Sequence, residues 1–166
     1  MPNLLAADNV TFEQQFPDTY TATIIAGYFG KNKEDVMDAS FLSTTDLMLN
    51  DKGLANIDGI EIFTNLHTLE LSNNKITTLP ESLSNLTTLT WLNFSANKVT
   101  KLPENIGNLS NLNYICASDN QITSLPISFN SLPAKTEKWF LNNLLPVSAG
   151  TQDQLLLKTG LDTQTN

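Results

Sequence analysis

Few residues in this chain could carry covalent or metal chemistry. Cys116 is the only cysteine and His67 the only histidine. An enzyme needs a nucleophile with its base, a metal cluster or a phosphate-binding loop, and the sequence contains no HExxH, GxGxxG, GxxxxGKS/T or GxSxG pattern. No basic residue adjoins Cys116 to activate its thiol. We therefore expect no catalysis, no cofactor and no metal site, and the remaining candidates are residues that bind.

Asparagines recur at a fixed spacing through the second half of the chain. Asn74, Asn97 and Asn120 are equally spaced, and Asn143 follows at the same interval. The first three lie in the segments LHTLELSNNKITTLP, LTWLNFSANKVTKLP and LNYICASDNQITSLP. Because one amide both donates and accepts hydrogen bonds, we expect these four residues to form a buried asparagine ladder at the turn that leaves each strand.

The pattern LxxLxLxxNxIxxLP, with a period of about 23 residues, resembles the leucine-rich repeat family. This resemblance implies an α/β fold: a right-handed leucine-rich repeat solenoid with a parallel β-sheet on the concave face and a small helical N-terminal cap. We place the repeats at residues 46–145, in about five units of which the first and last are atypical. In the first unit Lys52 stands where asparagine is expected, at a slightly shorter interval before Asn74.

Alternation along each strand sends one set of side chains inward and the other onto the concave face. Trp91 and Tyr114 are the most informative outward residues, because exposed aromatic side chains are the usual anchors of binding sites. Two alternatives stay open: cross-strand stacking that only stabilises the sheet, and a place for Trp139 in the core of a terminal cap. The predicted partner-binding residues are Glu70, Trp91, Asn93, Tyr114, Cys116, Glu137 and Trp139.

Residues 1–45 are predicted to form a lead-in and a helical cap. The start of the chain, to about position 12, shows no periodicity. Asp18 is expected to cap a helix that ends at Gly30, and a second helix is expected over KNKEDVMDASFL. The inward residues of these helices are expected to be Ile24, Ile25, Tyr28, Val36, Met37, Phe41 and Leu42. The order FPD, helix, GK, helix and degenerate repeat is similar to the cap of internalin-like surface proteins of Gram-positive bacteria, whose repeats, however, are usually about 22 residues long.

The repeat pattern weakens after Pro126. Lys135 and Lys138 occupy positions held by apolar residues one repeat earlier, which is typical of a closing edge. We expect the last repeat to be sealed by Trp139, Phe140, Leu144 and Leu145. Residues 146–166 are predicted to form a C-terminal tail or closing segment, with a final strand at QLLLKTG.

Composition narrows the class of partner. A formal net charge of −8 and an isoelectric point near 4.4 argue against nucleic acid or an anionic membrane. No run reaches the ~18 apolar residues of a membrane span, and MPNLLAADNV lacks the features of a signal peptide. We expect a monomer that binds a protein or peptide. The internalin resemblance implies an extracellular or cell-surface location, while a cytoplasmic scaffold and a repeat domain of a larger enzyme stay open as alternatives.

Overall fold

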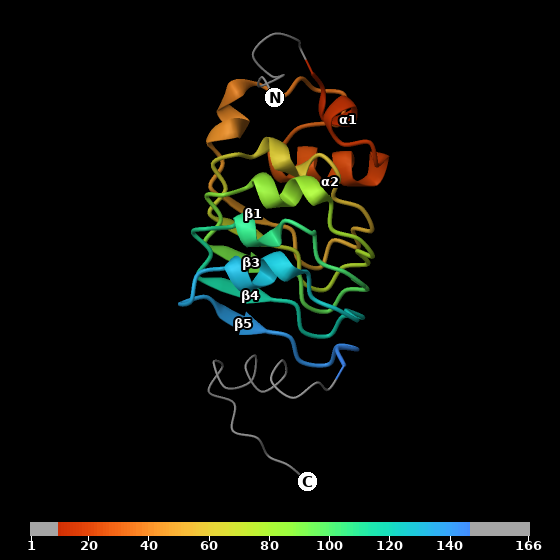
Figure 1. Ribbon diagram of the computed structural model, residues 1–166. Coiled ribbons are helices and arrows are strands. Elements are labelled where there is room, and N and C mark those ends of the chain that lie inside the picture. Colours follow the sequence, from red (N-terminus) through yellow and green to blue (C-terminus); the bar gives the residue numbers. More distant parts are fainter. Residues whose placement is uncertain (1–9, 147–166) are drawn as a thin grey trace.

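The computed structural model describes residues 10–146 as a stack of turns along one axis, from the N-terminal cap to the last strand (Figure 1). Each turn contributes one short strand to a parallel sheet in the order β1-β2-β3-β4-β5. The strands are β1 Asp46–Met48, β2 Thr68–Glu70, β3 Trp91–Asn93, β4 Tyr114–Cys116 and β5 Glu137–Trp139. The predicted α/β leucine-rich repeat solenoid is confirmed.

Each of the strands β1 to β4 is followed by a return segment that carries a short 3₁₀-helix on the opposite, convex side (Figure 1). The 3₁₀-helices of the repeats are η3 Ile60–Ile62, η4 Glu81–Asn85, η5 Ile106–Asn108 and η6 Ile127–Ser131. The step along the chain from Asp46 to its partner Thr68 is shorter than the step from Thr68 to Trp91, yet the register continues unbroken. The convex segments therefore absorb the difference in length.

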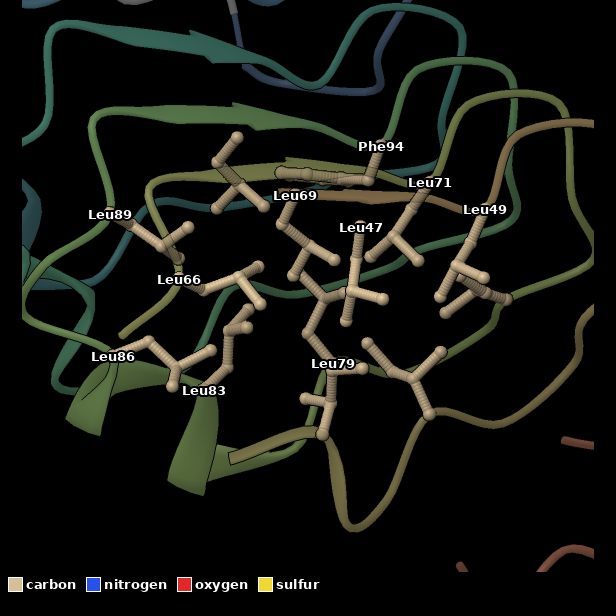
Figure 2. Packing of buried hydrophobic residues seen from close by; sticks show 14 of the residues in the cluster. Leu47, Leu49, Leu66, Leu69, Leu71, Leu79, Leu83, Leu86, Leu89 and Phe94 are labelled. Carbon is tan, nitrogen blue, oxygen red and sulfur yellow. The ribbon is translucent and has the colours of Figure 1, made fainter. Parts of the chain in front are cut away.

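The core lies between the sheet and the convex segments. Leu69 and Leu71 project from the strand side toward Leu83 and Leu86 of the η4 turn, and all four are fully buried (Figure 2). Burial of each such side chain contributes about 1.5–3 kcal/mol, and no single repeat encloses it alone. Stacking of the turns is therefore the main source of stability.

The asparagines satisfy the backbone where the chain turns away from the sheet. In the middle turn, the side-chain amide of Asn97 donates to the carbonyl oxygens of Leu71 (2.9 Å) and Phe94 (3.0 Å). Its Oδ1 accepts from the amide of Ile76 at 2.9 Å. Asn74, Asn120 and Asn143 make the equivalent contacts with their own neighbouring turns.

The residue before each of these asparagines, and before Lys52 in the first turn, adopts a left-handed backbone conformation. Asp or Asn, which tolerate this region, stand at all but one of these positions, and the exception is alanine. The residues are Asp51 (φ 58°), Asn73 (φ 54°), Ala96 (φ 54°), Asp119 (φ 57°) and Asn142 (φ 53°). Asn142 donates to Asp119 at 2.7 Å, and Asn73 donates to Asp51, so the side chains form a second ladder that Ala96 interrupts.

The N-terminal cap holds two α-helices, α1 Phe12–Gln15 and α2 Thr19–Tyr28. Asp18 caps α2 through the amide of Thr21 (2.7 Å), and Gly30 follows the helix with φ 68°, both as predicted. The expected lead-in to about residue 12 is wrong at its end, because Thr11 and Gln14 form a capping box that starts α1 and Phe12 is fully buried.

The second predicted helix over KNKEDVMDASFL is not present as such. Asp35 accepts from the amide of Asn32, forming a local turn that competes with a helix. Val36 pairs with Thr11 in an isolated antiparallel bridge and is exposed, and only the 3₁₀-helix η2 Ala39–Ser43 follows. Met37 and Phe41 are buried as predicted, Leu42 and Ile24 are half-buried, Ile25 is buried, and Tyr28 is exposed.

Side chains of α2 bond to the backbone of the first turn. The hydroxyl of Tyr28 donates to the carbonyl oxygen of Asp46 (3.2 Å) and that of Tyr20 to Lys52 (2.8 Å). Thr21 donates to the carbonyl oxygen of Asn56 at 2.6 Å. The bond to Asp46 gives a partner to a backbone carbonyl of β1, the first edge strand, which would otherwise be open to another strand, and the bonds to Lys52 and Asn56 hold the segment that follows β1.

The last strand differs from the others at its inward position. Lys138 pairs in register with Ile115 and is 8% exposed, and its ammonium group lies 6.0 Å from the centre of the Phe129 ring. Lys135 is exposed. Phe140 and Leu145 are buried as expected, but Leu144 is 64% exposed and does not seal this end. The predicted strand at QLLLKTG and nearly all of the predicted tail lie outside the described residues.

A candidate binding face

The outward side chains of the five strands form three rows across the sheet, and we call these fifteen positions the concave face. Strand register and backbone hydrogen bonds align each row. The first row is Asp46, Thr68, Trp91, Tyr114 and Glu137. The second is Met48, Glu70, Asn93, Cys116 and Trp139. The third is Asn50, Ser72, Ser95, Ser118 and Leu141. The seven predicted partner-binding residues thus lie in the first two rows.

Trp91 and Tyr114 stack face to face across neighbouring strands. Their ring centres are 3.8 Å apart and their planes differ by 9°. Trp91 keeps 40% of its surface exposed and Tyr114 is half-buried. Stacking holds both rings in place but does not bury them, so they form a rigid apolar platform on the concave face.

The phenol of Tyr114 lies in a partly desolvated, negatively charged environment. Burial, followed by the neighbouring Cys116 and then by the charges of Glu70 and Glu137, raises the pKa of Tyr114 to about 12. Tyr114 therefore stays neutral at physiological pH and keeps its hydroxyl as a donor.

Glu70 is part of the face, but its carboxylate is buried, with 8% of the residue exposed. One oxygen accepts from the amide of Ser72 (3.0 Å) and the other from the side-chain amide of Asn93 (2.9 Å). Asn93 in turn accepts from the amide of Ser95 at 3.0 Å. The outward direction of Glu70 was predictable from strand alternation, whereas this satisfied network was not.

The other two carboxylates of the face differ in their surroundings. Asp46 accepts from the Thr45 hydroxyl (2.7 Å), and hydrogen bonds from Thr68 and Thr45 hold the pKa of Asp46 below its usual range. Glu137 is exposed beside Tyr114, and within residues 10–146 its carboxylate makes no hydrogen bond or ion pair. The fifteen positions include these three acidic residues and no lysine or arginine.

Cys116 and Trp139 pair on the last two strands of the second row. The Cys116 sulfur lies 3.8 Å from the hydroxyl of Ser118. Trp139 is half-buried, and its indole nitrogen is inaccessible and without a hydrogen-bond partner in the part of the chain that the structure describes. His67 is exposed immediately before β2, and no cluster of three metal-ligating side chains occurs within residues 10–146.

The sequence matches the Leucine Rich Repeat family model over residues 65–86 and 88–109. A search of curated proteins finds no match. Among solved structures, the internalin InlF of Listeria monocytogenes superposes with a TM-score of 0.76 and 30% identity over 93% of this chain. The chain is an internalin-like leucine-rich repeat protein. The likeness includes the cap, since only a small part of the chain lies outside the alignment.

The internalin-like chain spans 45% of the length of InlF. A second structure, the functional domain of L. monocytogenes InlJ, aligns with 88% of this chain and is itself covered to 45%, at 21% identity and a TM-score of 0.45. That domain includes a cysteine ladder, whereas this chain has one cysteine. Among residues 10–146, no helix is long and apolar enough to cross a membrane.

Proposed function

We propose that this internalin-like protein is a non-catalytic recognition module, exported to the surface or surroundings of a bacterial cell, that binds a host or surface protein through its concave face. The observation that carries the proposal is the Trp91–Tyr114 platform. A flat aromatic surface that remains 40% exposed at Trp91 offers apolar area to a partner at little entropic cost, because the stack already fixes both rings.

The size of the face limits the kind of contact. The strands are spaced about 4.8 Å apart, and the face extends along each of them for about 17 Å from the first row to the third, so it presents roughly 320 Å² in projection. A standard interface buries about 800 Å² per partner. An extended peptide or a protruding loop fits such an area. A larger partner would also contact the flanks or repeats of a longer natural protein.

The test begins with a panel of purified extracellular host and bacterial surface proteins, measured against the full chain by surface plasmon resonance. For any partner found, Trp91→Ala and Tyr114→Ala should weaken binding by about tenfold or more. The matched control is Ile127→Ala, which removes a 90% exposed apolar side chain from the convex helix η6 and should leave affinity unchanged. Equal loss in all three variants, or none in any, would contradict a concave site.

Export is tested separately on the source organism. Antibodies raised against the purified chain should label intact cells or their medium, and protease added outside should remove the cell-bound signal. Labelling only after lysis would instead support a cytoplasmic scaffold.

A further inference from the structure

The first row of the concave face places an aromatic ring beside an exposed carboxylate. We propose that the site recognises an arginine side chain of its protein partner, with the guanidinium lying on the Tyr114 ring and paired with the carboxylate of Glu137. This inference rests on the proposed function and narrows it to a partner with an exposed arginine on a loop or extended segment.

The surroundings of the three carboxylates point to Glu137. Both oxygens of Glu70 already accept hydrogen bonds inside the protein, so ligand binding there would displace existing partners. Asp46 is held by two threonine hydroxyls and lies on β1, separated from Tyr114 by the strands β2 and β3. Glu137 is exposed, and among residues 10–146 its carboxylate has no such partner.

The stack leaves one face of the Tyr114 ring toward Glu137. Trp91 precedes Tyr114 in the row and Glu137 follows it. Because the ring centres are 3.8 Å apart with nearly parallel planes, the stacking direction runs along the row from β3 to β4. The second face of Tyr114 is therefore directed to β5, where Glu137 stands at the adjacent position.

Charge complementarity selects a cation. The fifteen positions of the face carry three acidic residues and no basic one, on a chain of net charge −8. The charges of Glu70 and Glu137 contribute to the raised pKa of Tyr114, so the negative potential reaches the ring. A planar guanidinium can stack on an aromatic face and bond to a carboxylate with the same group, which an ammonium does less well.

The probe is the blocked tripeptide N-acetyl-Gly-Arg-Gly-amide, titrated into the full chain at low ionic strength and followed by NMR. The indole resonance of Trp91, assigned with a Trp139→Phe variant, and the backbone amide of Glu137 should shift and saturate. The citrulline analogue, which keeps the shape without the charge, should bind about tenfold more weakly, and the lysine analogue several-fold more weakly.

Two variants locate the carboxylate. Glu137→Gln should reduce the affinity for the arginine peptide to that for the citrulline peptide, whereas Glu104→Gln, an exposed glutamate before η5, should leave it unchanged. Three results would each overturn the inference. The arginine and citrulline peptides could bind with equal affinity, the Glu137→Gln variant could bind the arginine peptide as tightly as the parent chain does, or the resonances of Trp91 and Glu137 could show no saturable shift.

The Glu137→Gln variant also distinguishes a failure of this inference from a failure of the proposed function. A protein partner that loses affinity with Trp91→Ala but not with Glu137→Gln would leave the concave recognition face standing and remove the arginine site. A partner that is insensitive to both variants would contradict both.

Discussion

The side chain of Lys138 bonds to the carbonyl oxygen of Thr136, with the ammonium nitrogen 3.2 Å from the oxygen. In every earlier repeat the equivalent carbonyl accepts an amide of the next strand. The carbonyl acceptors are Thr45, His67, Thr90 and Asn113, which bond to the amides of Thr68, Trp91, Tyr114 and Glu137. Lys138 thus supplies a donor where a sixth strand would otherwise add one, and it places a charge at an inward position.

Replacing Lys138 should expose this edge. Lys138→Ile restores the residue type of Ile115 and frees the Thr136 carbonyl, so we expect concentration-dependent self-association through β5, measured by sedimentation velocity. Lys135→Ile, at an exposed position shortly before β5, is the control for added apolar surface. If both variants sediment as the parent chain does at the same concentrations, Lys138 does not protect the edge.

Replacing a ladder asparagine in an inner turn of the stack should lower the free energy of unfolding. Asn97→Leu leaves the buried amide of Ile76 without its acceptor and removes one of the two asparagine donors from each of the carbonyl oxygens of Leu71 and Phe94, so urea unfolding should show a free energy of unfolding lowered by about 2 kcal/mol or more. Asn143→Leu should cost less, because Asn143 is half-buried and water can replace its bonds. Equal losses would argue against burial as the cause.

The interruption of the second ladder can be repaired. Ala96 adopts φ 54° and is exposed, and alanine carries a steric cost in this region. Ala96→Gly should raise the free energy of unfolding, because glycine adopts this backbone conformation without strain. Ala96→Asn should raise it by about 0.5–1 kcal/mol and adds a side-chain amide between Asn73 and Asp119. Thermal unfolding measures both. A lower melting temperature for Ala96→Asn would contradict the expectation.

Gly107 and Gly27 should respond in opposite directions to alanine. A Cβ atom at Gly107 would lie 2.0 Å from the carbonyl oxygen of Ser128 in the next turn, so Gly107→Ala should cost about 1–3 kcal/mol or more. At Gly27, inside α2, a Cβ atom meets nothing within 4 Å, and Gly27→Ala should stabilise by about 0.5–1 kcal/mol. Denaturant midpoints of the two variants give the comparison.

The raised pKa of Tyr114 makes stability fall in alkaline solution. Between the usual tyrosine pKa of 10.0 and about 12, the unfolded chain has released this proton and the folded chain has not. Rising pH therefore favours unfolding in this interval. Tyr114→Phe should reduce the slope of stability against pH there, and phenolate absorbance should show a component that titrates well above pH 10.0 in the parent chain and is missing from the variant. If the parent chain lacks this late component, the raised pKa of Tyr114 is contradicted.

The sequence predicted the repeats well because their core positions recur at fixed spacing, as Leu69, Leu92 and Ile115 do. It predicted the cap less well, since each cap element occurs once. The capping box at Thr11 and Gln14 was present as a local signal for α1, whereas the position of Val36 depends on its bridge to Thr11, which is distant in the sequence.

The rows of the concave face followed from alternation and period. The exposure of individual side chains on the concave face could not be predicted in this way, because exposure depends on neighbouring side chains from adjacent strands. The carboxylate of Glu70 accepts a hydrogen bond from Asn93 of the next strand, which covers it. The ring of Trp91 stacks on that of Tyr114 one repeat later. Assignment of these residues to a partner stays a prediction.

The tolerance of the convex side for repeats of unequal length has an evolutionary consequence. A duplication or loss of one whole unit changes the length of the face by a single strand spacing and leaves every remaining row aligned. Recombination between such units can therefore exchange outward side chains while the inward ones stay interchangeable, so new specificities can arise without a new fold.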